Sequence, residues 1–190
     1  MKMTRLLRYL PPLALASLGL LSGCEQQPDP NAKKVIEACL SVSAADASAI
    51  LGQTLTANKM SGDDAPRSIC AFNDASNSTY GLVQLQSAAK IKDPQADLAS
   101  DQNFELGVYK DNVKPATAHP AQGFMPGSFY LYVSPAMGSY SVQLYTFVEG
   151  YKTLVVVNNL KDYASGEKLA AAMANKVAEN IKNGTAFQAQ

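Results

Sequence analysis

Side chains capable of acid–base or nucleophilic chemistry are few in this chain, and their spacing does not assemble a catalytic set. The single histidine, His119, stands in Ala118-His119-Pro120, and no GxSxG motif occurs. Nucleophilic catalysis needs a nucleophile, a base and a group that orients the base. A loop histidine beside proline is a poor base because little holds it in place. The acidic residues are scattered, mostly in loops and helix starts, where capping accounts for them. We therefore expect no catalytic residue and no enzymatic activity.

Metal ligands are equally sparse. Met125 and Met137 lie near His119 in the sequence, and thioether with imidazole ligands suits copper, but no MxxM or HxxM cluster occurs. Asp63-Asp64 lacks the repeated oxygen ligands of a calcium loop. We expect no metal and no other cofactor, and we interpret the methionines as packing residues.

Residues 1–23 have the composition of a secretory signal peptide. The first eight residues contain three basic side chains and no acidic one, and Tyr9–Leu21 is a run of 13 residues that is apolar apart from one serine. A bilayer-spanning helix needs roughly 20 residues, so this shorter run favours a cleaved leader. An uncleaved membrane anchor is the weaker alternative, since two prolines also interrupt the run.

The leader ends on Leu21-Ser22-Gly23-Cys24, which resembles the lipobox of bacterial lipoproteins. In that family the cysteine thiol receives a diacylglyceryl group, the leader is cut just before the cysteine, and the new amino terminus is usually acylated. The resemblance implies that Cys24 is the lipidated first residue of the mature protein. Two or more acyl chains anchor a protein stably, whereas one does not. We therefore expect membrane attachment through Cys24.

The segment after the cysteine predicts a tether and a location. Residues 24–30 are polar and contain two prolines, as in a linker between membrane and domain. In enterobacterial-type sorting, aspartate after the cysteine favours inner-membrane retention. Glu25 stands there instead, so we expect the outer membrane, facing the periplasm, rather than the inner membrane. The remaining length suits a single domain over 31–184 with a tail over 185–190.

The charge balance of the mature chain excludes one class of partner. It has 13 basic and 16 acidic residues, a net charge of −3. Nucleic-acid-binding proteins usually carry a basic face, so we expect no nucleic-acid partner.

Two cysteines, Cys39 and Cys70, remain after lipidation. An even pair in an exported protein indicates a disulfide, which would close a loop of about 30 residues. A metal or redox pair is the alternative, but the chain has no CxxC motif and its histidine is distant in sequence.

Hydrophobic periodicity and turn residues predict an α+β fold in which helices flank an antiparallel β-sheet. The expected helices are 31–40, 43–51, 93–109 and 165–183, and the expected strands are 68–73, 79–87, 128–133, 139–148 and 151–158. Ser43 with Asp46 predicts a capping box at the start of helix 43–51, and Pro94 suits the first position of helix 93–109. Segments 58–66 and 114–126 are expected to be loops. Glu149-Gly150 predicts a two-residue hairpin, with Val148 opposite Tyr151 and the pairing continuing through 146–153, 144–155 and 142–157. Leu169, Met173, Val177 and Ile181 recur every fourth residue and predict the buried stripe of the last helix.

Alternating aromatic residues give the only binding hypothesis that the sequence offers. Tyr130 and Tyr132 alternate in one predicted strand and Tyr145 and Phe147 in the next, so we place all four on one face of the sheet, opposite Leu144 and Val155. An open face would be a partner surface. We favour the alternative that a helix covers it.

A second resemblance covers roughly residues 38–182. It is carried by Ala38-Cys39-Leu40-Ser41, Ala44-Ala45-Asp46, Leu51-Gly52 and Cys70-Ala71-Phe72. These motifs resemble a family of small lipoproteins without an assigned activity, best known from actinobacteria, whose fold is similar to that of PsbP, the extrinsic photosystem subunit. The resemblance implies a PsbP-like sandwich and a disulfide.

These features favour a non-enzymatic, lipid-anchored envelope protein that binds another protein, as an accessory subunit, an assembly factor, or an inhibitor or immunity-type protein. A small-molecule binder with a pocket at one end of the sheet is the alternative. An enzyme with dispersed carboxylates is the third and weakest interpretation.

The anchor is directly testable. Cys24→Ser should abolish lipidation, because the acceptor thiol is gone, and should leave a soluble or uncleaved form. Detergent partitioning and intact mass of both proteins measure this. An unchanged membrane fraction, with no lipid mass on the wild-type protein, would contradict the prediction.

Overall fold

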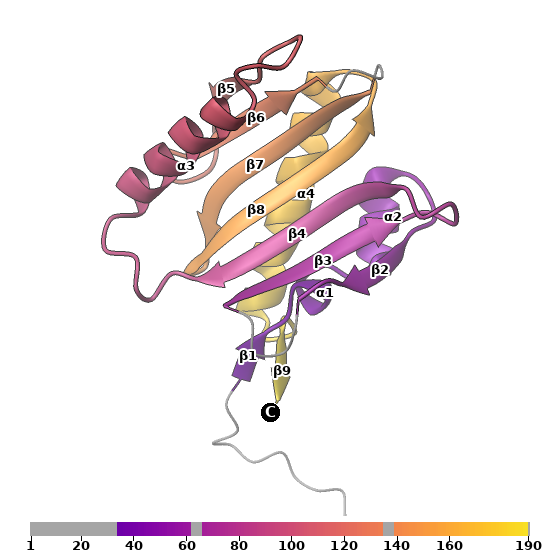
Figure 1. Ribbon diagram of the computed structural model, residues 1–190. Helices are drawn as coiled ribbons and strands as arrows, with labels where there is room; N and C mark the ends of the chain where they lie inside the picture. The colour runs from indigo at the N-terminus through magenta and orange to yellow at the C-terminus, as the bar shows by residue number, and fades with distance from the viewer. Residues whose placement is uncertain (1–33, 62–65, 135–138, 190) are drawn as a thin grey trace, which may run out of the picture. The chain divides into compact units, whose positions relative to one another are not determined.

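The computed structural model describes residues 34–61, 66–134 and 139–189, which belong to one compact unit. Within these residues, a seven-stranded antiparallel sheet has the strand order β2-β3-β4-β8-β7-β6-β5, and β1 and β9 form a separate two-stranded sheet (Figure 1). The strands are β1 Lys34–Ile36, β2 Thr56–Lys59, β3 Arg67–Asn73, β4 Thr79–Ser87, β5 Thr117–Pro120, β6 Phe129–Val133, β7 Tyr140–Val148, β8 Tyr151–Leu160 and β9 Phe187–Ala189. The helices are α1 Ala38–Ser41, α2 Ala44–Leu51, α3 Pro94–Val108 and α4 Tyr163–Lys182. The predicted α+β class with an antiparallel sheet is confirmed.

The β7–β8 hairpin forms with the predicted register. Glu149 and Gly150 have φ angles of 47° and 82°, the left-handed conformations that a type I′ hairpin turn requires. Val148 lies opposite Tyr151, and the pairing continues through 146–153, 144–155 and 142–157 as predicted. β8 also pairs with β4 along seven residues, so it lies in the middle of the sheet.

Helix α4 lies behind the sheet in the view of Figure 1 and packs mainly on β7 and β8. Met173 and Val177 of its predicted stripe are fully buried, and Leu169 and Ile181 pack at the margin of the same core. The helix begins at Tyr163, earlier than predicted, because the Asp162 carboxylate accepts a hydrogen bond from the Ser165 N–H and caps it.

One glycine sets the distance between α4 and the sheet. A Cβ atom on Gly166 would lie 2.4 Å from Leu160 Cδ1 and 2.6 Å from Val142 Cγ2. Any larger residue would therefore push the helix away from β7 and β8.

Helices α1 and α2 lie on the same side of the sheet as α4. The disulfide between Cys39 and Cys70, predicted from the sequence, joins α1 to β3. Ser43 and Asp46 form the predicted capping box of α2, and Gly52 ends that helix with φ of 74°.

Helix α3 covers the other side of the sheet near β5, β6 and β7 (Figure 1). Asp93 caps it through hydrogen bonds from the N–H groups of Gln95 and Ala96, with Pro94 in the first turn as predicted. Leu98 is its fully buried residue, in a second apolar cluster with Phe129, Leu131 and Tyr145.

The predicted helix 31–40 is wrong in its described part. Lys34–Ile36 forms β1, which pairs with β9, and only Ala38–Ser41 is helical. The predicted tail therefore contains a strand, and the fold extends to Ala189. Backbone pairing with residues some 150 positions away outweighed a weak local helix preference.

Two expected loops contain short edge strands. β2 extends to Lys59, and β5 occupies Thr117–Pro120. Both are largely exposed and polar, so they lack the alternation that reveals a half-buried strand, and the proline of β5 is tolerated because the strand lies at the edge.

The disulfide should contribute strongly to stability. Replacing Cys39 and Cys70 together by alanine should lower the free energy of unfolding by about 3–4 kcal/mol, because the bridge constrains the unfolded chain over a sequence separation of 31 residues. Urea unfolding of both proteins measures the difference. Two free thiols in non-reducing peptide maps of protein taken from the cell envelope would refute the bridge.

Candidate functional site

The four aromatic residues predicted to share a face lie on opposite faces of the sheet. Tyr130 is opposite Leu144 and Tyr132 is opposite Val142, so both point to the α4 side. Tyr145 and Phe147 belong to the cluster beneath α3. The prediction of one aromatic face is therefore wrong. The segment joining β6 to β7 is longer than a two-residue hairpin turn, so the sequence does not fix its register, and a shift of one residue moves a side chain to the other face.

Tyr145 is covered, as the favoured alternative expected. Its ring stacks on Phe129 with centroids 4.7 Å apart, and the residue is only 7% exposed. The hydroxyl donates a hydrogen bond to Gln143 Oε1. Burial, followed by the charge of Glu105 on α3, raises the pKa of Tyr145 well above its usual range. Tyr145 is thus a structural residue.

On the α4 side, three rings form a continuous stack. His119 stacks on Tyr132 at 4.1 Å between centroids, and Tyr132 stacks on Tyr163 at 4.2 Å. The Tyr132 hydroxyl donates a short hydrogen bond to Glu167, and burial, then this bond, raises the Tyr132 pKa. The Nε2 atom of His119 lies 3.0 Å from the Thr117 hydroxyl. Both faces of the Tyr132 ring are covered, one by His119 and the other by Tyr163. The raised pKa keeps the Tyr132 hydroxyl protonated. The stack therefore joins β5 and β6 to α4 and has a structural role.

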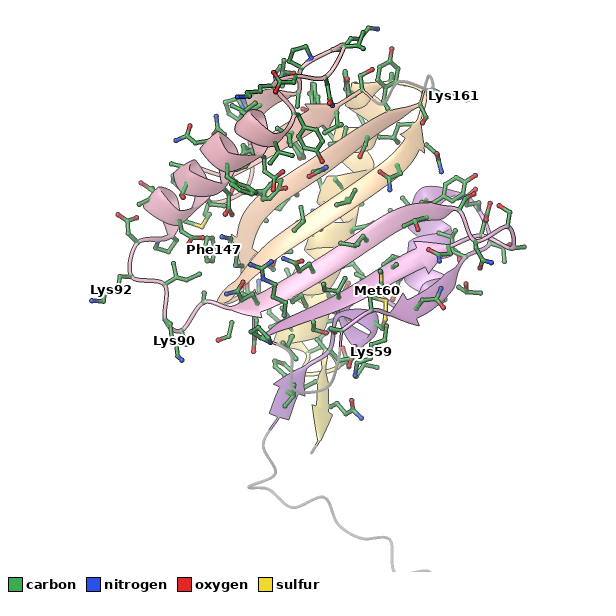
Figure 2. The ribbon with its side chains drawn as sticks, in the orientation of Figure 1. Lys59, Met60, Lys90, Lys92, Phe147 and Lys161 are labelled. Carbon is green, nitrogen blue, oxygen red and sulfur yellow. A yellow bond between two sulfur atoms is a disulfide. The ribbon has the colours of Figure 1, made fainter. Side chains whose placement is uncertain are left out.

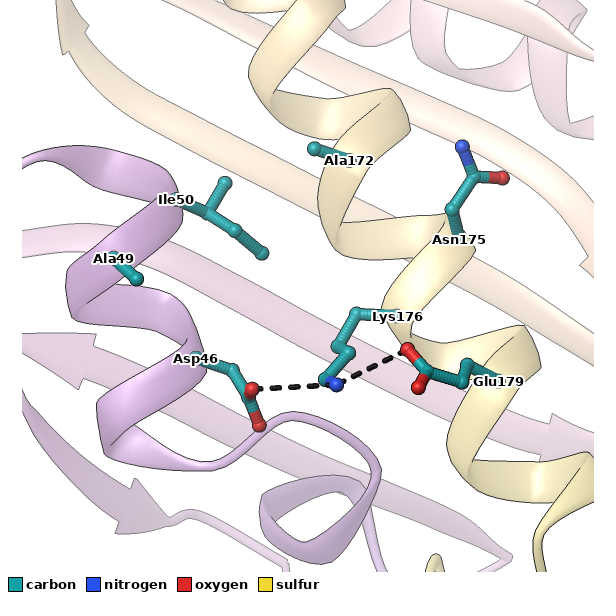
Figure 3. Close-up of a pocket in the computed structure, with 7 residues that line it drawn as sticks. All are labelled: Asp46, Ala49, Ile50, Ala172, Asn175, Lys176 and Glu179. Carbon is teal, nitrogen blue, oxygen red and sulfur yellow. Dashed lines mark hydrogen bonds and ion pairs between the residues drawn. The ribbon is translucent and has the colours of Figure 1, made fainter.

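A groove between α2 and α4 provides a recess among the described residues (Figure 3). Its volume is about 340 Å³. Ala49 and Ile50 of α2 and Ala172 of α4 form the apolar part of its lining. Two of these three side chains are alanines, which fill little of the space between the helices.

Charged groups line one end of the groove. Lys176 Nζ lies 3.0 Å from Glu179 Oε2 and 3.5 Å from Asp46 Oδ1, so it bridges α4 and α2 (Figure 3). Glu179, more than Asp46, raises the pKa of Lys176. Partial burial tends to raise the pKa of Asp46, but hydrogen bonds from Ser43 and the charge of Lys176 outweigh it and hold that pKa below its usual value. Two carboxylates and one ammonium leave this end with a net charge of −1.

The lining of this groove combines apolar and polar groups. An apolar recess accepts a hydrophobic side chain, the amide of Asn175 offers a donor and an acceptor, and the net negative end favours a cation. Each ion pair is exposed to water, so it contributes little to the free energy of folding. The acidic residues are held in pairs and caps, with no nucleophile beside them among the residues that line the groove.

Sequence reasoning missed this groove. Asp46 was identified only as a helix cap, and Lys176 lies 130 residues later in a different helix. Helices α2 and α4 are brought together by the tertiary fold, and no local sequence pattern predicts that they are neighbours.

The uncovered part of the α3 side is less distinctive. Half-buried Leu82 and Val156 lie opposite each other on β4 and β8, next to Gln84 and Leu154. The strongly exposed large apolar residues of the described chain lie elsewhere: Leu40, Met60, Phe104, Val108 and Val113.

Several predicted residues fall outside the described part of the chain. These are Cys24 with its leader and tether, Asp63-Asp64 and Met137. Over residues 34–61, 66–134 and 139–189, no group of three or more His, Cys, Asp or Glu side chains is placed to hold a metal ion, and no helix is long and apolar enough to cross a bilayer.

Tyr145→Ala should lower the free energy of unfolding by about 3 kcal/mol, because a large aromatic side chain is removed from beneath α3. Tyr145→Phe is the matched control: it keeps the stack on Phe129, loses only the hydroxyl, and should cost about 1 kcal/mol. Urea unfolding monitored by circular dichroism measures both. Equal stability of the alanine variant and the wild-type protein would mean that α3 does not cover this side chain in solution.

No family model matches this chain, and no curated protein matches it significantly. Among solved structures, the chain is similar to the extracellular domain of PknH from Mycobacterium tuberculosis, with 12% sequence identity and a TM-score of 0.48 over 77% of this chain and 98% of that domain. At that level of similarity, two proteins need not share an activity.

Proposed function

We propose that this chain is a non-enzymatic, lipid-anchored protein of the bacterial cell envelope that binds another protein through the groove between α2 and α4. The anchor part of the proposal is supported by Leu21-Ser22-Gly23-Cys24. The binding part is supported by one observation, an apolar recess of about 340 Å³ with a net negative end.

The lining of the groove indicates what the partner offers. Ala49, Ile50 and Ala172 fit one or two aliphatic or aromatic side chains, which gain about 25 cal/mol for each Å² of apolar surface removed from water. A lysine or arginine next to those side chains would pair with Glu179, whose side chain is 56% exposed and already faces Lys176. The expected partner therefore presents a short segment with an apolar residue beside a basic one, as in helix-in-groove recognition.

The location follows from the same leader. An acylated Cys24 followed by a tether would hold the domain at a membrane surface, and Glu25 after the cysteine favours the outer membrane facing the periplasm. A domain held at a membrane surface that binds another protein could be an assembly factor, an accessory subunit, or an inhibitor or immunity-type protein.

A small-molecule ligand is the second candidate. The groove volume lies at the lower end of the range for ligand sites. Its lining suits an amphiphilic amine, with the apolar body against Ile50 and the ammonium group at Glu179.

Filling the groove should remove binding without unfolding the protein. Ala172→Leu should raise the Kd for the partner roughly tenfold, because the leucine side chain occupies the space that a partner side chain would fill. A tenfold change corresponds to about 1.4 kcal/mol of binding free energy. Ala164→Leu, the same change at an exposed position of α4 outside the groove, is the matched control. A photo-crosslinking residue at Asn175, compared with one at Ala164, identifies the partner in intact cells.

The outcomes separate the candidates. A discrete crosslinked protein that forms from position 175, is absent from position 164, and is lost with Ala172→Leu supports the proposal. A bound amine lost with Ala172→Leu, without any crosslinked protein, favours the small-molecule alternative. Equal crosslinking from both positions would contradict a role for the groove.

A further inference from the structure

Helix α3 has the opposite charge distribution to an ordinary surface helix. Its acidic residues Asp97, Asp101 and Glu105 recur every fourth residue and face the sheet. Asp97 Oδ2 and Asp101 Oδ2 lie 2.5 and 2.6 Å from Lys152 Nζ on β8. Although partial burial tends to lower the pKa of Lys152, its bonds to Asp101 and Asp97 raise it above the usual value. This clamp fixes which face of the helix points outward.

The outward face of α3 carries no charge. The exposed positions of the helix are Gln95, Ala96, Ala99, Ser100, Asn103, Phe104, Gly107 and Val108. Phe104 and Val108 lie one turn apart and are 68% and 54% exposed, and Val113 in the following segment is 94% exposed. A surface helix normally turns its charged residues to water. Phe104 and Val108 follow Asp97 and Asp101 by seven residues, so they lie on the flank of the helix beside the two clamped carboxylates. Two large apolar side chains left exposed beside carboxylates that are already paired mark a surface that meets something other than water.

Lysines flank this face at both ends. Lys90 and Lys92 precede α3, and Lys110 and Lys114 follow it; all four are exposed. Two exposed acidic residues accompany them, Asp93, which caps the helix, and Asp111. The flanks therefore carry a net charge of +2. An uncharged face with an aromatic residue and basic flanks has the composition of a helix at a membrane interface, where lysines meet anionic headgroups.

Contacts link the segment before α3 to the β7–β8 turn, the end of α4 and the β1–β9 pair. The segment before α3 is held by a hydrogen bond from the Ala88 N–H to the Gly150 carbonyl, and Glu149 pairs with Lys182 at the end of α4. Phe187 of β9 lies against Tyr151, and β9 pairs with β1. Figure 2 shows Lys90 and Lys92 on the segment before α3. These contacts connect that basic segment to the β1–β9 pair through the β7–β8 turn and the end of α4.

We propose that the outward face of α3 lies on an anionic lipid surface, with Phe104 and Val108 inserted and the four lysines at the headgroups. This contact is separate from the acyl anchor and adds to it. Since α3 and α4 lie on opposite sides of the sheet (Figure 1), the contact leaves the α2–α4 groove facing the aqueous compartment. This inference depends on the proposed envelope location in one respect: the cell envelope is the source of the anionic lipid.

The absence of tryptophan from the chain permits a direct test. The mature chain from residue 24 carries Cys24→Ser, so that no acyl chain contributes, and keeps all described strands and helices. In this background, Phe104→Trp introduces a single indole on the outward face of α3. Leu40→Trp is the control, at an exposed apolar position of α1 on the α4 side. With phosphatidylglycerol vesicles, emission from position 104 should shift to the blue and be quenched by brominated acyl chains, whereas position 40 should stay unchanged.

Loss variants test the same contact without a probe. Phe104→Ser with Val108→Ser should lower the vesicle partition coefficient roughly tenfold, because apolar area no longer enters the interface. Leu40→Ser should leave it unchanged. Replacing Lys90, Lys92, Lys110 and Lys114 by glutamine should abolish the preference for phosphatidylglycerol over phosphatidylcholine vesicles. All these positions are exposed, so thermal melting should confirm that each variant is folded.

Other outcomes would overturn the inference. One is an indole at position 104 that remains in water in the presence of anionic vesicles. Another is a wild-type protein that dimerises, or binds only a protein, through Phe104, with no vesicle binding. The groove proposal fails or succeeds independently, because Ala172→Leu and crosslinking from position 175 leave vesicle partition unaffected.

Discussion

The β7–β8 hairpin is the constraint on which the sheet and both layers of helices depend. Two successive left-handed residues, Glu149 and Gly150, determine that Val148 faces Tyr151. From this turn to the Val142–Val157 pair, side chains of the two strands alternate between the layers. Thr153, Val155 and Val157 are thereby directed to α4, and Lys152 and Leu154 to the opposite side. A slip of one residue would place Lys152 in the main core, where its charge would lack a partner.

Local signals were sufficient for the elements that depend on neighbours in sequence. The hairpin register, the capping box of α2, the proline-initiated α3 and the four-residue stripe of α4 were all predictable, since each is encoded within about twenty residues. The edge strand β5 was not predictable because it is exposed and lacks alternation, and the face of Tyr130 and Tyr132 was not because no two-residue turn fixes the β6–β7 register. The β1–β9 pair was not predictable because distant backbone pairing decides it. The same reason hid the groove, whose two walls come from residues 46–50 and 172–179.

The two layers are held by different forces. On the α4 side, Gly166 allows close approach, and Met173 and Val177 fill the space against β7 and β8, so burial of apolar area supplies the free energy. On the α3 side the apolar cluster is smaller, and a half-buried lysine between two aspartates completes the contact. Such a pair contributes little net free energy, because desolvation of the charges offsets their attraction, but its geometry is specific.

That specificity explains why α3 turns the face it does. The carboxylates of Asp97 and Asp101 must stay at Lys152, because elsewhere on the sheet they would lose their partner while partly desolvated. A rotation of one residue about the helix axis, roughly 100°, would break both ion pairs and turn Phe104 toward the sheet. The clamp therefore keeps both carboxylates paired with Lys152 at the sheet, although they lie on the same flank of the helix as Phe104 and Val108. The same geometry that pairs the acids thus leaves Phe104 and Val108 exposed, while Leu98 is buried in the cluster beneath the helix.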